Sequence, residues 1–243
     1  YIRAQDKYPV VVKADGLALG KGVLICKDEA AAMAAVKSMM EDGAFGASGS
    51  RVVVEEFLTG PEVSVLSFTD GQTVVPMVSS MDHKRALDGD EGLNTGGMGT
   101  IAPNPYYTPE IAQVCMRTIF LPTIEAMRSE GCPFQGCLYF GLMLTPDGPK
   151  VIEYNCRFGD PETQVVLPLL EGDLLEIMQA TTNGTLAGVP VKWKDAYAAC
   201  VVLASGGYPQ TYESGKRITG LVEGQLPGGE ATVFHAGTRL EGG

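Results

Sequence analysis

Residues 150–162 read KVIEYNCRFGDPE, and the first six of them alternate as an extended strand does. A period of two places Val151, Glu153 and Asn155 on one face and the residues between them on the other. Adjacent carboxylate and amide oxygens suit Mg²⁺, which keeps several waters and shares the phosphates of a substrate. The alternative is a solvent-facing Glu–Asn pair on an edge strand. The apolar flanks and the charged turn that follows, with Arg157, favour a metal site beside phosphoryl groups.

A glycine-rich loop in residues 14–22 joins two segments that read as short buried strands, 10–13 and 23–26. Glycine lets backbone N–H groups approach a polyphosphate closely, and Lys13 and Lys21 supply compensating positive charge. The spacing matches neither the P-loop nor the dinucleotide-binding pattern. We therefore expect a flap over phosphates. Taken alone, an ordinary hairpin with solvated lysines explains this loop equally well.

Two further clusters lie between these segments. Residues 52–58 (VVVEEFL) predict a strand whose end can offer backbone groups to an adenine edge, with Glu62 placed for ribose hydroxyls. Residues 82–85 (DHKR) and 94–99 (NTGGMG) combine cations with a glycine-rich anion nest. The alternative for the first cluster is a strand end with solvated acids. The alternative for the second is a solvated run of charges with a flexible loop.

The rest of the chain predicts helices and hairpins in alternation. Residues 82–105 lack periodicity, and we expect one long functional loop there. The other expected elements are a helix over 28–42, a hairpin of 62–69 with 73–78, a helix over 108–130 disturbed at Pro122, a hairpin of 137–144 with 150–155, a broken helix over 162–182, a strand over 198–204 and short strands beyond it. This mixture indicates an α+β architecture with a domain boundary near Pro190.

Composition and charge narrow the kinds of partner and the cellular compartment that we expect. The 243 residues carry a net charge of −11, which disfavours nucleic acid and anionic membranes as bulk partners. The six cysteines form no C-x-x-C pair, so we expect reduced thiols rather than a zinc site or disulfides. No segment resembles a signal peptide or a spanning helix, and we expect a cytoplasmic protein. The chain begins with Tyr1 and stops at Gly243 without a terminal element, and we expect it to be part of a longer protein.

Seven motifs occur in an order that resembles one enzyme family. They are VVKADGLALGKGV (11–23), EEFLTGPE (55–62), DHKR (82–85), NTGGMG (94–99), EYNCRFGDPE (153–162), GGYP (206–209) and FHAGT (234–238). Together they resemble the glycinamide ribonucleotide synthetases of the ATP-grasp superfamily. The resemblance implies a fold in which two α+β subdomains sandwich ATP. It assigns residues 1–190 to an ATP-grasp domain lacking its N-terminal part, and 191–243 to the start of a small, mostly-β C-terminal domain.

The resemblance also implies roles for individual residues. Contacts to ATP fall on Lys13, Gly20, Lys21, Gly22, Glu55, Phe57, Leu58 and Glu62. The metal ligands, for Mg²⁺ or Mn²⁺, are Glu153 and Asn155. Arg157, Lys84 and Asp160 are the expected catalytic residues, and the expected substrate-binding turn is Asn94, Thr95, Gly96, Gly97 and Met98.

The implied activity is an ATP-dependent carbon–nitrogen ligation in purine biosynthesis. Glycine and 5-phosphoribosylamine would be joined through glycyl phosphate, giving glycinamide ribonucleotide, ADP and phosphate. The whole enzyme would be either stand-alone or fused to or associated with other purine-pathway enzymes. Another ATP-grasp carboxylate–amine ligase and an inactive nucleotide-binding fragment are the alternatives. We expect these 243 residues alone to bind Mg·ATP weakly and to have little or no synthetase activity.

Overall fold

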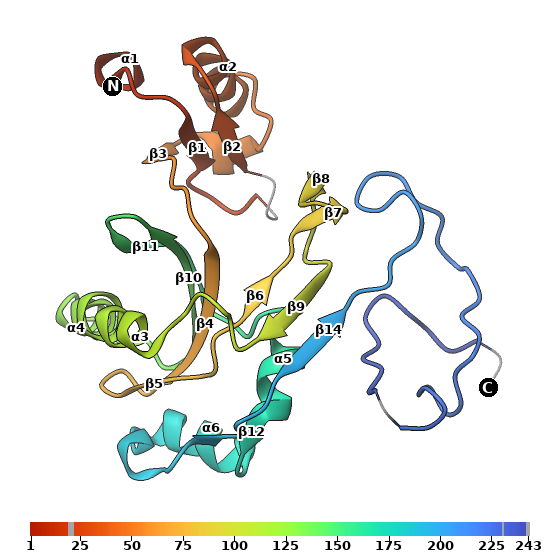
Figure 1. The fold of residues 1–243 in the computed structure, drawn as a ribbon. Helices are drawn as coiled ribbons and strands as arrows, with labels where there is room; N and C mark the ends of the chain where they lie inside the picture. Colours follow the sequence, from red (N-terminus) through yellow and green to blue (C-terminus); the bar gives the residue numbers. More distant parts are fainter. Residues whose placement is uncertain (19–21, 230, 242–243) are drawn as a thin grey trace. The chain divides into compact units, whose positions relative to one another are not determined.

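The structure is a computed structural model that describes residues 1–18, 22–229 and 231–241 (Figure 1). The chain divides into two compact units, Tyr1–Thr59 and Gly60–Gly243.

The first unit is a three-stranded antiparallel sheet with a helix on one face (Figure 1). Its elements are α1 (Ile2–Gln5), β1 (Val10–Ala14), β2 (Val23–Cys26), α2 (Glu29–Met40), a 3₁₀ turn (Gly46–Gly49) and β3 (Val52–Glu56), with strand order β2-β1-β3. The Asp28 side chain caps α2 by accepting a hydrogen bond from the Ala31 N–H at 2.8 Å. Val10 and Val12 of β1 pack against Ala32 and other α2 residues in a small core. The expected helix over 28–42 and the three strands are confirmed.

The second unit is built on a four-stranded antiparallel sheet of order β11-β10-β4-β5. Its strands are β4 (Glu62–Thr69), β5 (Val74–Pro76), β10 (Gly136–Thr145) and β11 (Gly148–Asn155). Around it lie the helices α3 (Pro109–Cys115), a π-helical turn (Met116–Phe120), α4 (Leu121–Ser129), α5 (Thr163–Val166), a 3₁₀ turn (Leu167–Leu169), α6 (Leu174–Asn183) and a second 3₁₀ turn (Leu186–Gly188). Both expected hairpins are confirmed.

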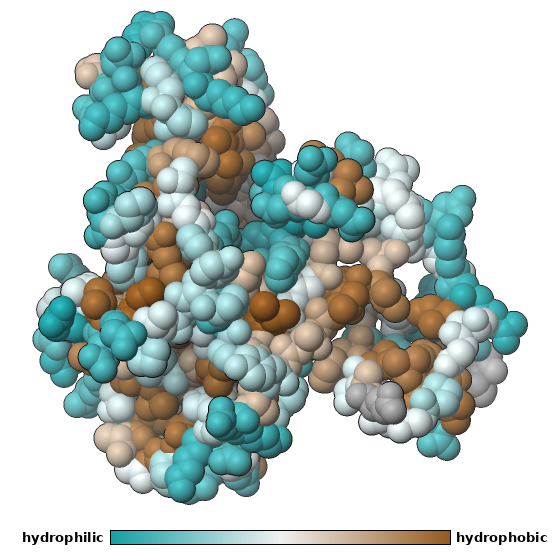
Figure 2. Space-filling view, viewed as in Figure 1, coloured by the Kyte–Doolittle hydropathy of each residue, from teal (hydrophilic) through white to brown (hydrophobic). Residues whose placement is uncertain are grey.

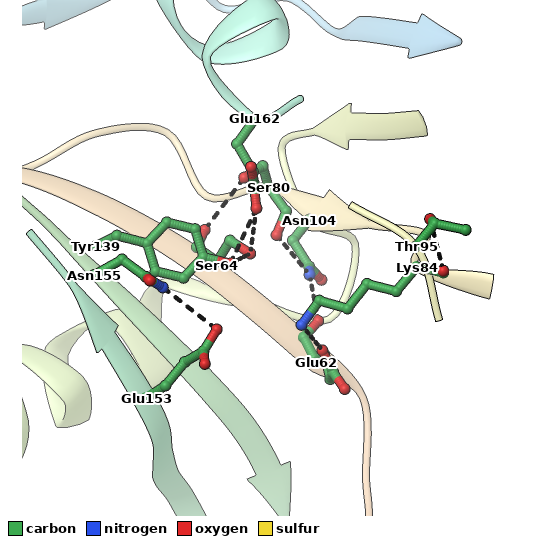
Figure 3. A network of polar contacts seen from close by, with 10 residues as sticks. All are labelled: Glu62, Ser64, Ser80, Lys84, Thr95, Asn104, Tyr139, Glu153, Asn155 and Glu162. Carbon is green, nitrogen blue, oxygen red and sulfur yellow. Dashed lines mark hydrogen bonds and ion pairs between the residues drawn. The ribbon is translucent and has the colours of Figure 1, made fainter. Parts of the chain in front are cut away.

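The two faces of this sheet have different cores. One face packs against α3, the π-helical turn and α4, where Phe120 and Phe140 stack with ring centroids 4.2 Å apart. The other face packs against α5 and α6, where Leu66 and Phe68 meet Val165 and Ile177. This second core covers only part of its face, and polar side chains occupy the rest (Figure 3).

The expectation of one long loop over 82–105 is wrong. This segment contains β6 (Met81–Asp82), β7 (Arg85–Leu87), β8 (Glu91–Asn94) and β9 (Gly99–Ala102). β7 and β8 form a small hairpin, and β9 lies between β6 and β14 (Ala198–Val201). These strands have two to four residues, too few to show an alternating pattern. They are paired through backbone hydrogen bonds, which leave no signature in the side chains.

A β-bulge corrects the expected face of Val151. Glu153 pairs with Gly141, but Val151 pairs with Leu142, so β11 has one extra residue between them. Val151 consequently packs with the core under α3 and α4, on the face opposite Glu153 and Asn155. The sequence alone gives no signal for this bulge, so a strict period of two misplaces Val151.

The helix over 108–130 and the C-terminal part also differ in detail from expectation. Thr108 caps α3, and the helix is interrupted by the π-helical turn before Pro122, which lies at the start of α4. After a short β12–β13 pair (Leu170–Glu171 with Lys192–Trp193) and β14, the described residues form turns without the expected short strands. Figure 2 shows hydrophobic surface on this last segment, where Leu203 and Phe234 are exposed. None of the helices in the described residues could cross a bilayer.

Candidate nucleotide and metal site

Glu153 and Asn155 lie side by side on the polar part of the sheet in the second unit (Figure 3). The Asn155 amide Nδ2 donates to Glu153 Oε1 at 3.3 Å. Glycine at position 141, across from Glu153, leaves room for this carboxylate, because a Cβ there would lie 3.1 Å from Glu153 Cγ. Glu153 and Asn155 therefore lie on one face of β11, as their spacing in the sequence predicted.

This pair fits a divalent cation that keeps most of its water. A carboxylate and an amide oxygen are hard ligands, and Mg²⁺ typically takes one or two protein oxygens with waters and phosphates. In the described part of the chain, no group of three or more His, Cys, Asp or Glu residues is arranged to hold a metal. A structural zinc-type cage is thus absent from these residues, while the two-ligand arrangement remains suited to a metal shared with a nucleotide.

Lys84 and Glu62 form an ion pair on the same side of the sheet (Figure 3). Lys84 Nζ donates to Glu62 Oε2 at 3.0 Å. Burial lowers the pKa of Lys84, but the contact with Glu62 and the charges of Glu153 and Asp82 outweigh it and raise that pKa. Lys84 is accordingly a permanent cation among several carboxylates.

A buried network joins the turn after β11 to the sheet. Tyr139 Oη lies 2.6 Å from Ser64 Oγ and donates to Glu162 Oε1 at 3.0 Å. Glu162 is only 3% exposed, and Tyr139 is the cross-strand partner of Asn155. The network thus fixes the charged turn beside the oxygen pair.

The turn of residues 94–98 is held by Lys84 and by close packing at Gly97. Thr95 donates to the Lys84 carbonyl through its N–H at 2.7 Å and its Oγ1 at 2.8 Å. A Cβ on Gly97 would lie 2.4 Å from Pro161 Cδ and 2.7 Å from Asp82 Oδ1, and its φ is +122°. Only glycine fits this position.

Asp82 is the most perturbed acid beside this turn. Its Oδ1 is buried and has no hydrogen-bond partner among the described residues. Burial, reinforced by the charge of Glu162, raises the pKa of Asp82 to about 7.

The other predicted residues of the second unit lie in exposed turns. Arg157 Nη1 donates to the Phe158 carbonyl at 2.9 Å, and Asp160 Oδ1 accepts from Gln164 Nε2 at 2.7 Å. Tyr208 of the GGYP motif accepts a hydrogen bond from the Gly96 N–H at 3.2 Å. The C-terminal segment therefore contacts the 94–98 turn directly.

The first unit presents a sheet face opposite α2 that combines apolar side chains with one ion pair. Strand register places Val11 and Lys13 of β1 on this face beside Ile25 and Val53. Lys13 Nζ lies 2.6 Å from Glu55 Oε2. An apolar face with a cation at its edge is chemically suited to a base and a phosphate chain.

The remaining predicted ATP contacts in this unit have mixed surroundings. Gly22 is buried next to Ala18, and its carbonyl accepts from the Ala14 N–H at 2.8 Å. Phe57 is 37% exposed and Leu58 is half-buried. Gly20 and Lys21 lie outside the described residues.

Within the second unit, the structure gathers most predicted residues around one face and adds others that sequence reasoning missed. The predicted ones on or beside this face are Glu62, Lys84, Glu153, Asn155 and the 94–98 turn. The missed ones are Ser64, Asn104 and Tyr139. Asp82 and Glu162 lie in motifs that the sequence singled out, but their burial beside this face was not expected. Ser64 could have been found, because it follows Glu62 at a spacing of two on one strand. Burial of Glu162 has no sequence signal.

Two family models match most of this chain. A family model described as "Phosphoribosylglycinamide synthetase, ATP-grasp (A) domain" matches residues 1–163, and one described as "Phosphoribosylglycinamide synthetase, C domain" matches residues 198–243. The chain belongs to the phosphoribosylglycinamide synthetase family. The expected ATP-grasp fold is thereby confirmed.

Family members of two kinds are similar to this chain. It is 52% identical over 243 residues to a phosphoribosylamine–glycine ligase of Allochromatium vinosum, covering 100% of this chain and 56% of the relative. It is 51% identical over 244 residues to the trifunctional purine biosynthetic protein adenosine-3 of Gallus gallus, covering 100% of this chain and 24% of that protein. The chain thus spans about half the length of the single-function relative and about a quarter of the trifunctional one.

Solved structures agree on the fold. The crystal structure of phosphoribosylamine–glycine ligase from Thermotoga maritima is 36% identical with a TM-score of 0.81, covering 92% of this chain and 56% of that one. The biotin carboxylase domain of Hydrogenobacter thermophilus 2-oxoglutarate carboxylase, solved with MgADP, is 17% identical with a TM-score of 0.60, covering 82% and 42%. At that identity the second likeness shows the fold alone.

Proposed function

We propose that this chain carries the ATP-binding and metal-binding parts of a ligase that joins glycine to 5-phosphoribosylamine. The supporting observation is one polar sheet face that holds the Glu153–Asn155 oxygen pair together with the Lys84–Glu62 ion pair (Figure 3). Membership of the synthetase family and the names of the similar ligases support the choice of substrates.

In the proposed reaction, a glycine carboxylate oxygen attacks the γ-phosphorus of ATP, and the bond from that phosphorus to ADP breaks. The amine of phosphoribosylamine then attacks the acyl carbon of glycyl phosphate, and inorganic phosphate leaves as the amine loses a proton. Neither step needs a protein nucleophile, so the protein acts by alignment and charge neutralisation.

We assign the residues the following roles in this reaction. Glu153 and Asn155 would hold Mg²⁺ or Mn²⁺, which would neutralise phosphate charge when bound. Lys13 and Lys21 would contact the phosphates, Glu55, Phe57 and Leu58 the adenine, and Glu62 the ribose, with Gly20 and Gly22 in the covering flap. Lys84, Arg157 and Asp160 would orient the reacting groups, and the 94–98 turn would hold the substrate.

Binding of Mg·ATP to this chain tests the nucleotide part of the proposal. Isothermal titration calorimetry should give weak, magnesium-dependent binding that Glu153→Gln weakens about tenfold or more, which corresponds to about 1.4 kcal/mol. Glu176→Gln, on an exposed position of α6, is the matched control and should bind as the unmodified chain does. Equal binding by both variants would refute the metal assignment.

Turnover by the full-length protein tests the substrates. ADP release should require both glycine and phosphoribosylamine, and alanine or bicarbonate should not replace glycine. Release with another carboxylate–amine pair would favour a different ATP-grasp ligase, and binding without turnover would favour a nucleotide-binding protein.

Domain organisation belongs to the same proposal. We place the ATP-grasp domain in residues 1–190 and the start of the C-terminal domain in 191–243. The similarity to both single-function and trifunctional proteins supports a parent protein that is either stand-alone or fused to later purine enzymes.

A further inference from the structure

We propose that Lys84 couples nucleotide binding to binding of the carboxylate substrate, by exchanging its partner Glu62 for that carboxylate when ATP arrives. This inference rests on the proposed function, in which Glu62 holds the ribose and the 94–98 turn holds the substrate. Its physical basis is that Lys84 contacts both places, one with its side chain and the other with its backbone (Figure 3).

The side-chain contact is easily exchanged. Lys84 Nζ and Glu62 Oε2 are 3.0 Å apart, and the two side chains are 35% and 47% exposed. Because both side chains are partly exposed to water, the pair contributes on the order of 1 kcal/mol, and a ligand that hydrogen-bonds the carboxylate can displace the lysine. Ribose hydroxyls are such a ligand, because they donate to carboxylate oxygens.

The backbones of both residues are fixed, unlike their side chains. The Glu62 carbonyl accepts from Asn104 Nδ2 at 2.9 Å, and Asn104 is 3% exposed. The Lys84 carbonyl accepts two hydrogen bonds from Thr95, at 2.7 and 2.8 Å. A change of partner by Lys84 Nζ therefore leaves the residue anchored to the 94–98 turn.

Released from Glu62, the Lys84 ammonium remains a cation beside the proposed substrate turn, because its backbone stays bound to Thr95. The negative charges of Glu153 and Asp82 also attract it, which favours the polar face over solvent. A substrate carboxylate then meets an ammonium that Glu62 no longer contacts. Nucleotide binding should consequently tighten substrate binding, and by reciprocity the substrate should tighten nucleotide binding by the same factor.

Equilibrium binding of glycine to the full-length protein tests this coupling. We expect radiolabelled glycine to bind about fivefold tighter or more when the magnesium complex of a non-hydrolysable ATP analogue is present. The 2′-deoxy form of the analogue, which lacks one hydroxyl for Glu62, should give a smaller factor.

Two variants and a control locate the effect. Lys84→Met should weaken glycine binding and reduce the coupling factor to about one, while nucleotide still binds. Glu62→Gln should raise glycine affinity without nucleotide, because the lysine is already released. The control, Lys216→Met, breaks another exposed Lys–Glu pair of 3.1 Å and should leave the coupling unchanged.

The outcomes separate this inference from the proposed function. If neither nucleotide nor glycine binds the folded protein, the proposed function fails. If both bind but independently, or if Lys84→Met keeps the full coupling, only the role of Lys84 is overturned. Should Lys84→Met not fold, Glu62→Gln decides: unchanged glycine affinity in the absence of nucleotide refutes the exchange.

Discussion

Removing the Tyr139 hydroxyl should destabilise the second unit measurably. Tyr139 Oη contacts Ser64 Oγ at 2.6 Å and Glu162 Oε1 at 3.0 Å, in surroundings where Tyr139 is 4% and Glu162 is 3% exposed. Tyr139→Phe keeps the ring but, among the described residues, leaves the Glu162 carboxyl with Ser64 Oγ as its side-chain partner, at 3.4 Å.

The expected magnitude follows from that loss. A hydrogen bond to a charged group contributes about 1.5–3 kcal/mol, and an unsatisfied buried acceptor costs a similar amount. We therefore expect the free energy of unfolding to fall by about 2 kcal/mol. For a protein of this size, that corresponds to a decrease in Tm of about 4–8 °C.

Urea unfolding followed by tryptophan fluorescence measures this change. The chain has one tryptophan, Trp193, which packs against the core of the second unit and reports on its unfolding. Tyr197→Phe is the matched control, because Tyr197 is 87% exposed, and its effect should stay within about 0.5 kcal/mol.

A Tyr139→Phe protein that unfolds within about 0.5 kcal/mol of the unmodified one would refute the network as a source of stability. A double-mutant cycle with Ser64→Ala locates the interaction energy. Independent, additive effects would mean that the short contacts around Glu162 are geometrically close but energetically unimportant.

Three further predictions concern the turn beside this network and the strand that carries Glu62. The pKa of Asp82 is raised from 3.8 to about 7, so its ionisation costs stability as pH rises through that interval. In thermal melts, Asp82→Asn should therefore raise Tm above about pH 7.5 and leave Tm unchanged near about pH 4. Gly97→Ala should lower the free energy of unfolding in urea by about 2 kcal/mol or more, because the new Cβ would meet Pro161 and Asp82 at a φ of +122°. Gly188→Ala is the control and should be nearly neutral, because a Cβ there has open space around it. Asn104→Ala should lower stability by about 1–3 kcal/mol, because the Glu62 and Ser80 carbonyls each lose one hydrogen bond. A loss below about 0.5 kcal/mol in urea unfolding would contradict its anchoring role.

Much of the fold follows from local sequence signals. Asp28 and Thr108 mark helix starts because a short polar side chain can accept an N–H of the first turn. The Asp70–Gly71 turn predicts the β4–β5 hairpin because glycine tolerates its φ of +89°. Such features depend on a few neighbouring residues, so the sequence displays them directly.

The sequence by itself determined the strands of the β2-β1-β3 and β11-β10-β4-β5 sheets, the main helices and the shared face of Glu153 and Asn155, because periodicity and capping act over a few residues. Only the tertiary structure decided the bulge that turns Val151 away, the burial of Glu162 and the pairing of Lys84 with Glu62. The reason is distance along the chain: Ser64 and Glu162 are 98 residues apart, and no local pattern records which distant groups a folded sheet brings together.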